Sequence, residues 1–66
     1  MERKWLTDIR EDKGLNQKEV SDAAGISQPA YSNIENGERN PSVDTAKKIA
    51  AVLGFEWTRF YDDETD

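Results

Sequence analysis

Four polar side chains between positions 28 and 36 have the spacing of one helical face and share one hydrogen-bonding chemistry. They are Gln28, Ser32, Asn33 and Asn36, and on a helix they fall within an arc of about 140° that also contains Pro29. A solvated helix face usually contains Lys and Glu, and this arc contains neither. Side-chain amides can form two hydrogen bonds with an adenine edge, so the arc suits the major groove of DNA. The alternative interpretation is a solvated polar face that happens to lack charges.

The sequence around this face predicts the helix that carries it and a second helix before it. Ser27 can cap the carrying helix, and Pro29 fits its first turn. The preceding helix is expected to begin after Asn16, which has Glu19 three residues later, as in a capping box. Because the link Gly25–Ser27 is short, the two helices must cross steeply. This is the layout of a helix-turn-helix motif.

Three more helices complete a predicted all-α fold of five helices. The first helix is expected to run to about Lys13, and the fourth follows Ser42, which can cap it. The fourth has the clearest amphipathic repeat, formed by Val43, Ala46, Ile49, Ala50 and Leu53. A short fifth helix is aromatic, with Trp57, Phe60 and Tyr61. The glycines that follow the first four helical segments are expected to close them in the left-handed conformation: Gly14, Gly25, Gly37 and Gly54.

Length and composition narrow the functions open to this chain. Its 66 residues make one domain, and they include no cysteine and no histidine. The chain therefore lacks the commonest general base, thiolate ligands and disulfides, and we expect no catalytic residue, no cofactor and no metal site. The longest apolar run, residues 49–53, is far below the roughly 18 residues of a membrane span. These features favour a cytoplasmic protein that is neither an enzyme nor a membrane protein.

The acidic residues are concentrated at the end of the chain. The net charge is −5, but Asp62, Asp63, Glu64 and Asp66 supply four of the fourteen acids. Residues 1–61 contain nine basic and ten acidic residues, so their net charge is −1. We therefore expect a nearly neutral folded domain over 1–61 and a disordered acidic tail over 62–66. Metal binding by the tail is a weaker alternative, because a flexible string of acids has no fixed coordination geometry.

Two short motifs give the chain a family resemblance. Gly25-Ile26-Ser27 stands before the third helix, and Ile34-Glu35-Asn36-Gly37 is followed by Arg39-Asn40-Pro41-Ser42 after it. With the pattern of the other helices, they make residues 5–61 similar to the Cro and lambda-repressor-like helix-turn-helix family, also called the XRE family. The resemblance implies a transcriptional regulator that inserts its third helix into the major groove of double-stranded DNA. Members often bind palindromic operators as two-fold dimers, frequently as repressors.

The resemblance also implies roles for individual residues. The positions that meet base edges are Gln28, Pro29, Ser32 and Asn33. The positions that contact the DNA backbone are Gln17, Asn36, Arg39 and Asn40, with Gln17 also bracing Gln28. Arg10 and Glu35 match two positions that commonly form a structural ion pair between the first and third helices.

Two positions depart from the family pattern. Pro29 occupies a position where a polar, base-contacting residue is common. Its side chain offers only apolar contact, such as to a thymine methyl group. Glu56 occupies a position before the fifth helix that is usually Ser or Thr. Both departures, together with the acidic net charge, bear on affinity for DNA rather than on the fold.

The aromatic residues near the end of the chain suggest how two copies could associate. Phe55 and Phe60 are expected in the core, whereas Trp57 and Tyr61 are candidates for a dimer interface, where aromatic residues are enriched. The leading hypothesis is therefore a homodimer that binds an operator. The alternative is a protein-interaction module, such as an antitoxin or adaptor, that uses the same fold and meets a basic partner through its acidic surface.

Overall fold

The computed structural model describes residues 2–62, and within them every regular element is a helix. The five helices are α1 (Lys4–Asp12), α2 (Gln17–Ala24), α3 (Gln28–Glu35), α4 (Val43–Leu53) and α5 (Arg59–Asp62). The all-α, five-helix prediction is confirmed. Residues 63–66, most of the expected acidic tail, lie outside the described part of the chain.

Local signals in the sequence set most helix boundaries. Asn16 accepts from the backbone of Glu19 while Glu19 accepts from the backbone of Asn16, so the predicted capping box is present. The hydroxyl oxygens of Ser27 and Ser42 cap α3 and α4 by accepting from the backbone N–H groups of Ala30 and Thr45. Gly25 follows α2 with φ of 73°, a left-handed conformation in which a side chain would be strained. The turn at Gly25 sets the direction in which α3 leaves α2.

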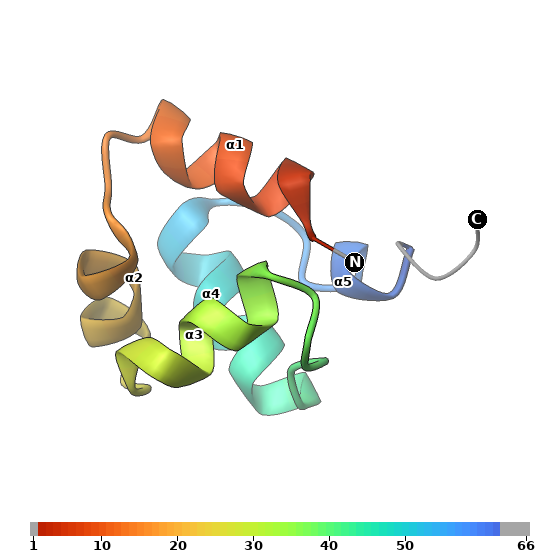
Figure 1. The fold of residues 1–66 in the computed structure, drawn as a ribbon. Helices are drawn as coiled ribbons and strands as arrows, with labels where there is room; N and C mark the ends of the chain where they lie inside the picture. Colours follow the sequence, from red (N-terminus) through yellow and green to blue (C-terminus); the bar gives the residue numbers. More distant parts are fainter. Residues whose placement is uncertain (1, 63–66) are drawn as a thin grey trace.

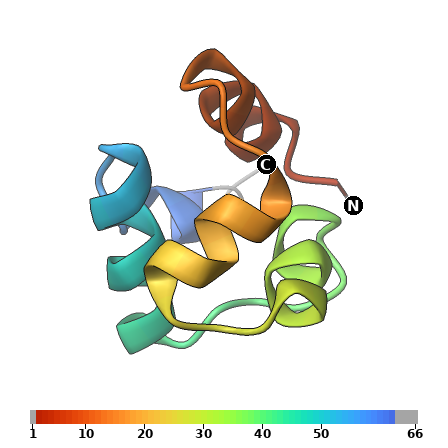
Figure 2. The same cartoon turned by 90° about the vertical axis from the view of Figure 1, so that its left-hand side faces the viewer.

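The helices pack around one small core. Helix α2 packs against both α3 and α4, and α1 lies across the top of the molecule and packs on α3 (Figure 1). The view in Figure 2 shows α2 and α3 crossing steeply, as the short turn between them requires. The buried hydrophobic side chains come from all five helices: Leu6, Val20, Ala24, Tyr31, Ile34, Ala46, Ile49, Ala50, Leu53 and Phe60.

Two details differ from the sequence-based expectations. Val43 was expected on the buried face of α4 but is 48% exposed. It is the first residue of α4, and the start of this helix lies at the edge of the molecule, so few neighbours can cover its side chain (Figure 1). Trp57 was expected inside the fifth helix, but α5 begins only at Arg59 and Trp57 lies in the preceding turn.

An aromatic cluster joins the two ends of the described chain. The Trp5 ring meets Phe55 and Phe60 edge to face, each with ring centroids 5.3 Å apart. Phe55 and Phe60 also meet in this way, at 5.6 Å. Edge-to-face packing is favourable for aromatic rings, so these contacts hold α1 against α5.

No helix in the described part of the chain is long and apolar enough to cross a membrane.

Candidate nucleic-acid interface

Helix α3 presents one uncharged polar face and buries the other. Gln28, Pro29 and Asn36 are exposed, and Ser32 and Asn33 are half-buried. On the opposite side, Tyr31 and Ile34 are buried in the core. The structure therefore brings the four predicted base-reading residues together on one helix, with Asn36 as its C-cap. The hydrogen-bonding groups of Gln28, Ser32 and Asn33 have the chemistry that base edges in a major groove require, and Pro29 offers an apolar surface.

The start of α3 combines two features that keep its first turn rigid. The Ser27 hydroxyl accepts a hydrogen bond of 3.2 Å from the backbone N–H of Ala30. Pro29 lies in the first turn, where its missing N–H leaves no helical hydrogen bond unmade. The exposed side chain of Gln28 therefore projects from a fixed backbone.

The end of α3 is held by an ion pair between Arg10 and Glu35. Arg10 Nε donates to Glu35 Oε1 at 2.8 Å and Arg10 Nη2 donates to Glu35 Oε2 at 3.2 Å, which gives a two-point contact. The two side chains are only 12% and 6% exposed. The remaining Arg10 nitrogen, Nη1, donates to the backbone carbonyl of Leu15 at 2.8 Å. The pair thus joins α1, the link after it and α3.

Two further donors complete the surroundings of the Glu35 carboxylate. The Tyr31 hydroxyl donates to Oε1 and the Gln17 amide Nε2 donates to Oε2, each at 2.8 Å. Burial alone would raise the pKa of Glu35, but the hydrogen bonds from Arg10, Gln17 and Tyr31 outweigh it, so this pKa lies below its ordinary value. Burial and the bond to Glu35 raise the pKa of Tyr31, which therefore stays protonated and acts as a donor.

The Gln17 contact defines how this residue is placed. Gln17 is the first residue of α2, and its amide is bonded to Glu35 at the far end of α3. No hydrogen bond joins Gln17 to Gln28 among the described residues. The side chain of Gln17 is half-buried, so part of it stays accessible next to the exposed face of α3. One N–H of its amide remains beyond the bond to Glu35, as a donor to a phosphate requires.

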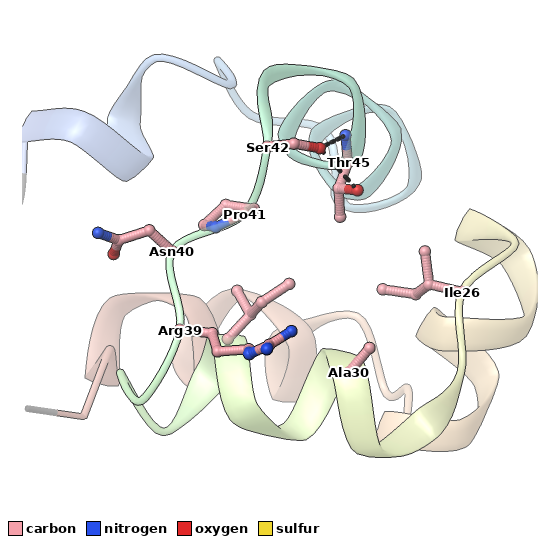
Figure 3. A pocket seen from close by; sticks show the side chains of 8 residues that line it. Ile26, Ala30, Arg39, Asn40, Pro41, Ser42 and Thr45 are labelled. Carbon is pink, nitrogen blue, oxygen red and sulfur yellow. Dashed lines mark hydrogen bonds between the residues drawn. The ribbon is translucent and has the colours of Figure 1, made fainter.

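A pocket lies beside α3, between that helix, the loop after it and the start of α4. Its volume is about 330 Å³. Figure 3 shows the Arg39 side chain extending along α3 toward Ala30, whereas the Asn40 side chain points the other way from the loop. The lining residues are Ile26, Ala30, Ile34, Arg39, Asn40, Pro41, Ser42 and Thr45. Two of the predicted backbone-contacting residues therefore lie at one edge of the reading helix.

Comparison with known proteins places this geometry in a family. The sequence profile of the helix-turn-helix family matches residues 6–60. The chain belongs to the XRE family of helix-turn-helix transcriptional regulators. This is a family of DNA-binding regulators and not of enzymes, in agreement with the sequence-based prediction.

Individual relatives support the assignment. This XRE-family chain is 52% identical over 63 residues to the uncharacterized HTH-type transcriptional regulator YqaF of Bacillus subtilis, and the match covers 96% of this chain and 83% of YqaF. It is 36% identical over 66 residues to the HTH-type transcriptional regulator DdrOP3 of Deinococcus deserti, across 91% of this chain and 51% of DdrOP3.

A solved structure agrees with the fold. The N-terminal DNA-binding domain of SinR from Bacillus subtilis superposes with a TM-score of 0.81 at 26% identity, covering 96% of this chain and 93% of that domain. The lambda-repressor-like fold expected for an XRE-family protein is therefore confirmed.

Arg3 is a buried residue of this XRE-family domain that the sequence analysis did not single out. Its guanidinium Nη1 donates to the backbone carbonyls of Ile34 at 2.6 Å and Arg39 at 3.1 Å. Its Nη2 donates to Asn40 Oδ1 at 2.5 Å, and its own backbone N–H donates to the carbonyl of Glu35 at 2.8 Å. Arg3 therefore bonds the end of α3 and the loop that follows. Nothing in the sequence near Arg3 indicates contacts more than 30 residues away.

The two aromatic residues proposed for the dimer interface form a separate group in the XRE-family domain. The rings of Trp57 and Tyr61 meet edge to face with centroids 5.8 Å apart, and Lys47 Nζ lies 5.2 Å from the Trp57 centroid. Both aromatic side chains are half-buried. Helix α5 lies on the opposite side of the molecule from α2 and the turn before α3 (Figure 1). A partner bound at Trp57 and Tyr61 would leave that turn accessible.

The described residues contain no group of three or more acidic side chains arranged to hold a metal ion. The alternative of metal binding by the tail concerns residues that lie mostly outside the described part of the chain.

Proposed function

We propose that this XRE-family regulator reads double-stranded DNA in a sequence-specific manner by inserting α3 into the major groove. One observation carries the proposal: the polar face of α3 offers amides and one hydroxyl without a single charge, on a helix whose two ends are both fixed. In this assignment Gln28, Ser32 and Asn33 donate to or accept from base edges, and Pro29 supplies an apolar contact. The absence of charge favours reading bases over attracting phosphates.

Contacts with the DNA backbone are assigned to residues that flank the reading helix. They are Gln17 at the start of α2, and Asn36, Arg39 and Asn40 at the end of α3 and in the turn that follows it. The Arg39 side chain runs along α3 at the edge of the pocket, a position from which its guanidinium can meet a phosphate (Figure 3). These contacts set the register of α3 in the groove.

The proposed regulator acts in the cytoplasm as a homodimer on a palindromic operator. A nearly neutral domain with one reading helix gains limited affinity from phosphates and covers only a few base pairs. Two copies related by a two-fold axis place their reading helices about 34–36 Å apart, one turn of DNA. Trp57 and Tyr61 are the proposed anchors of the interface, because half-exposed aromatic residues often dominate interface energies. Occupation of an operator is enough to block transcription, which favours repression.

Selection from a pool of random DNA duplexes tests the proposal directly. Purified full-length protein is expected to enrich a palindrome whose half-sites lie one helical turn apart. A single enriched half-site would overturn the dimer but keep the reading function. Enrichment of no motif would overturn sequence-specific reading and favour the protein-interaction module.

A further inference from the structure

Arg3 is buried where a positive charge cannot meet DNA itself. The residue is only 6% exposed, and its guanidinium carbon lies 5.6 Å from the centroid of the Phe60 ring. Its donors face inward to the carbonyls of Ile34 and Arg39 and to the side chain of Asn40. Any effect of Arg3 on a ligand must therefore pass through the groups that it holds.

The bond to Asn40 decides which end of that amide is free. A guanidinium can only donate, so it must meet the amide oxygen, and Nη2 of Arg3 does meet Oδ1 of Asn40. The opposite end of the amide is the Nδ2 group, which has two N–H donors. A phosphate can only accept, so an amide turned the other way would present the wrong group to it. Asn40 is exposed, so its Nδ2 group is accessible.

The same guanidinium also fixes the backbone on both sides of the loop. It bonds the Ile34 carbonyl in the last turn of α3 and the Arg39 carbonyl in the loop. The backbone N–H of Arg3 also donates a hydrogen bond to the carbonyl of Glu35. The loop that carries Arg39 and Asn40 is thereby held at a set distance from the reading helix.

We propose that Arg3 is a positioning residue for DNA binding that acts through Asn40: it turns the Asn40 amide so that Nδ2 faces a backbone phosphate, and its bonds to the loop backbone keep that amide in place. This inference rests on the proposed function, because it requires Asn40 to contact DNA. It predicts that the charge of Arg3 matters less than the forked shape of its guanidinium.

The charge-conserving variant Arg3→Lys tests whether DNA binding depends on the forked shape of the Arg3 guanidinium. A lysine ammonium concentrates its donors at one point and cannot reproduce the fork that spans the two carbonyls and Asn40. We expect Arg3→Lys to weaken binding to the selected operator and to random DNA alike by about three- to tenfold, as for one lost hydrogen bond. Arg59→Lys is the matched control: Arg59 lies over the Trp5 ring at 4.8 Å, away from the loop, and its exchange should leave DNA affinity unchanged.

A double-mutant cycle with Asn40→Ala separates this inference from the proposed function. If Arg3 acts through Asn40, the two single variants lose similar affinity and the double variant loses little more than either. If Asn40→Ala alone has no effect, the assignment of Asn40 to the DNA backbone is wrong, and the inference fails with it. If Asn40→Ala weakens binding but Arg3→Lys does not, or the losses multiply, the DNA contact stands and the role of Arg3 is overturned.

A second variant covers the case in which Arg3→Lys unfolds. Asn40→Asp keeps an acceptor for Arg3 but offers no donor to a phosphate, so thermal melts should show a stability at least equal to the wild type. Asn16→Asp makes the same charge change at an exposed residue next to Gln17 to which no DNA contact is assigned, and an aspartate oxygen can still accept from the Glu19 N–H, so this variant is the control for repulsion. Asn40→Asp is expected to lose more DNA affinity than Asn16→Asp. A marked loss of stability in Asn40→Asp, or equal losses of affinity, would overturn the inference.

Discussion

The side-chain amide of Gln17 donates a 2.8 Å hydrogen bond to Glu35 Oε2, and so connects the first residue of α2 to the last residue of α3. The two helices of the motif are thus joined at their distant ends as well as by the short turn between them. The same carboxylate accepts from Arg10 and Tyr31. Because one buried charge holds three neighbours, changes at Glu35 should affect both stability and the presentation of Gln17.

The first prediction concerns the coupling between Arg10 and Glu35. Removing either partner leaves the other charge buried, and Glu35→Ala or Arg10→Ala should each lower the free energy of unfolding by about 3–5 kcal/mol. The double variant should lose clearly less than the sum of the two. Urea melts of all three variants measure the coupling, with the pair Lys4 and Asp8 as an exposed control expected to give less than about 1 kcal/mol. Additivity within about 0.5 kcal/mol would show that Arg10 and Glu35 do not stabilise each other.

The second prediction concerns the stability of the fold at acid pH. Folding lowers the pKa of Glu35 from its ordinary value of 4.5. A carboxylate with a lowered pKa stabilises the native state above its ordinary value, and this contribution disappears as the pH falls through the lowered value. The free energy of unfolding should therefore fall below about pH 5. Glu35→Gln should be less stable at pH 7 and should depend less on pH in the acid range. Urea melts from pH 7 to pH 3 give the free energy of unfolding as a function of pH for the wild type and for Glu35→Gln. Parallel pH dependences of the two proteins would contradict the prediction.

The third prediction concerns base reading. Gln28→Ala and Asn33→Ala should each cost about 1–3 kcal/mol of binding to the selected operator while changing binding to random DNA little. The control is Thr58→Ala, an exposed polar residue before α5, which should change neither affinity. Fluorescence anisotropy with the two duplexes gives the comparison. Equal losses on operator and random DNA would remove these two residues from the base-reading set.

The fourth prediction concerns the DNA backbone. Arg39→Ala should weaken binding to every duplex and reduce the slope of log Kd against log salt concentration by roughly one unit, since one phosphate contact is lost. Lys4→Ala removes the same charge from an exposed site on α1 and should leave the slope nearly unchanged. An unaltered slope for Arg39→Ala would place its guanidinium away from any phosphate.

The fifth prediction concerns self-association. Trp57→Ala should weaken the homodimer more than it lowers the free energy of unfolding, because the ring is half-buried within one copy. Trp57→Phe keeps an aromatic ring and should retain more of the association. Sedimentation with and without operator measures the dimer, and urea melts measure folding. A wild type that stays monomeric under both conditions would remove Trp57 and Tyr61 from an interface.

Local chemistry made the backbone of this fold predictable from sequence. The capping residues Asn16, Ser27 and Ser42 and the glycines act within a few residues of themselves, so their effect does not depend on distant parts of the chain. The polar face of α3 followed in the same way from helical periodicity. Val43 was misjudged because periodicity identifies a face of a helix but not how far its neighbours extend along it.

The side-chain network could be predicted only in part. The pairing of Arg10 with Glu35 followed from the resemblance to the family, not from the spacing of the two residues. The bond from Gln17 to Glu35 depends on how α2 packs against α3, which no local pattern encodes. The bond from Tyr31 to Glu35 joins two residues four apart on α3, a spacing visible in the sequence that the sequence analysis did not use. Arg3 gave no signal, because a charged residue near a chain end ordinarily remains in solvent.

The two tryptophans occupy unrelated surroundings, and this makes them separate optical reporters. Trp5 is enclosed by Phe55, Phe60 and the guanidinium of Arg59, whereas Trp57 meets Tyr61 and Lys47 at the proposed interface. A Trp57→Phe protein keeps Trp5 as its single tryptophan, whose emission follows the loss of the core. A Trp5→Phe protein keeps Trp57, whose emission would report the docking of a second copy at the proposed interface. Unfolding and association can thus be recorded as two independent signals, each from one indole ring.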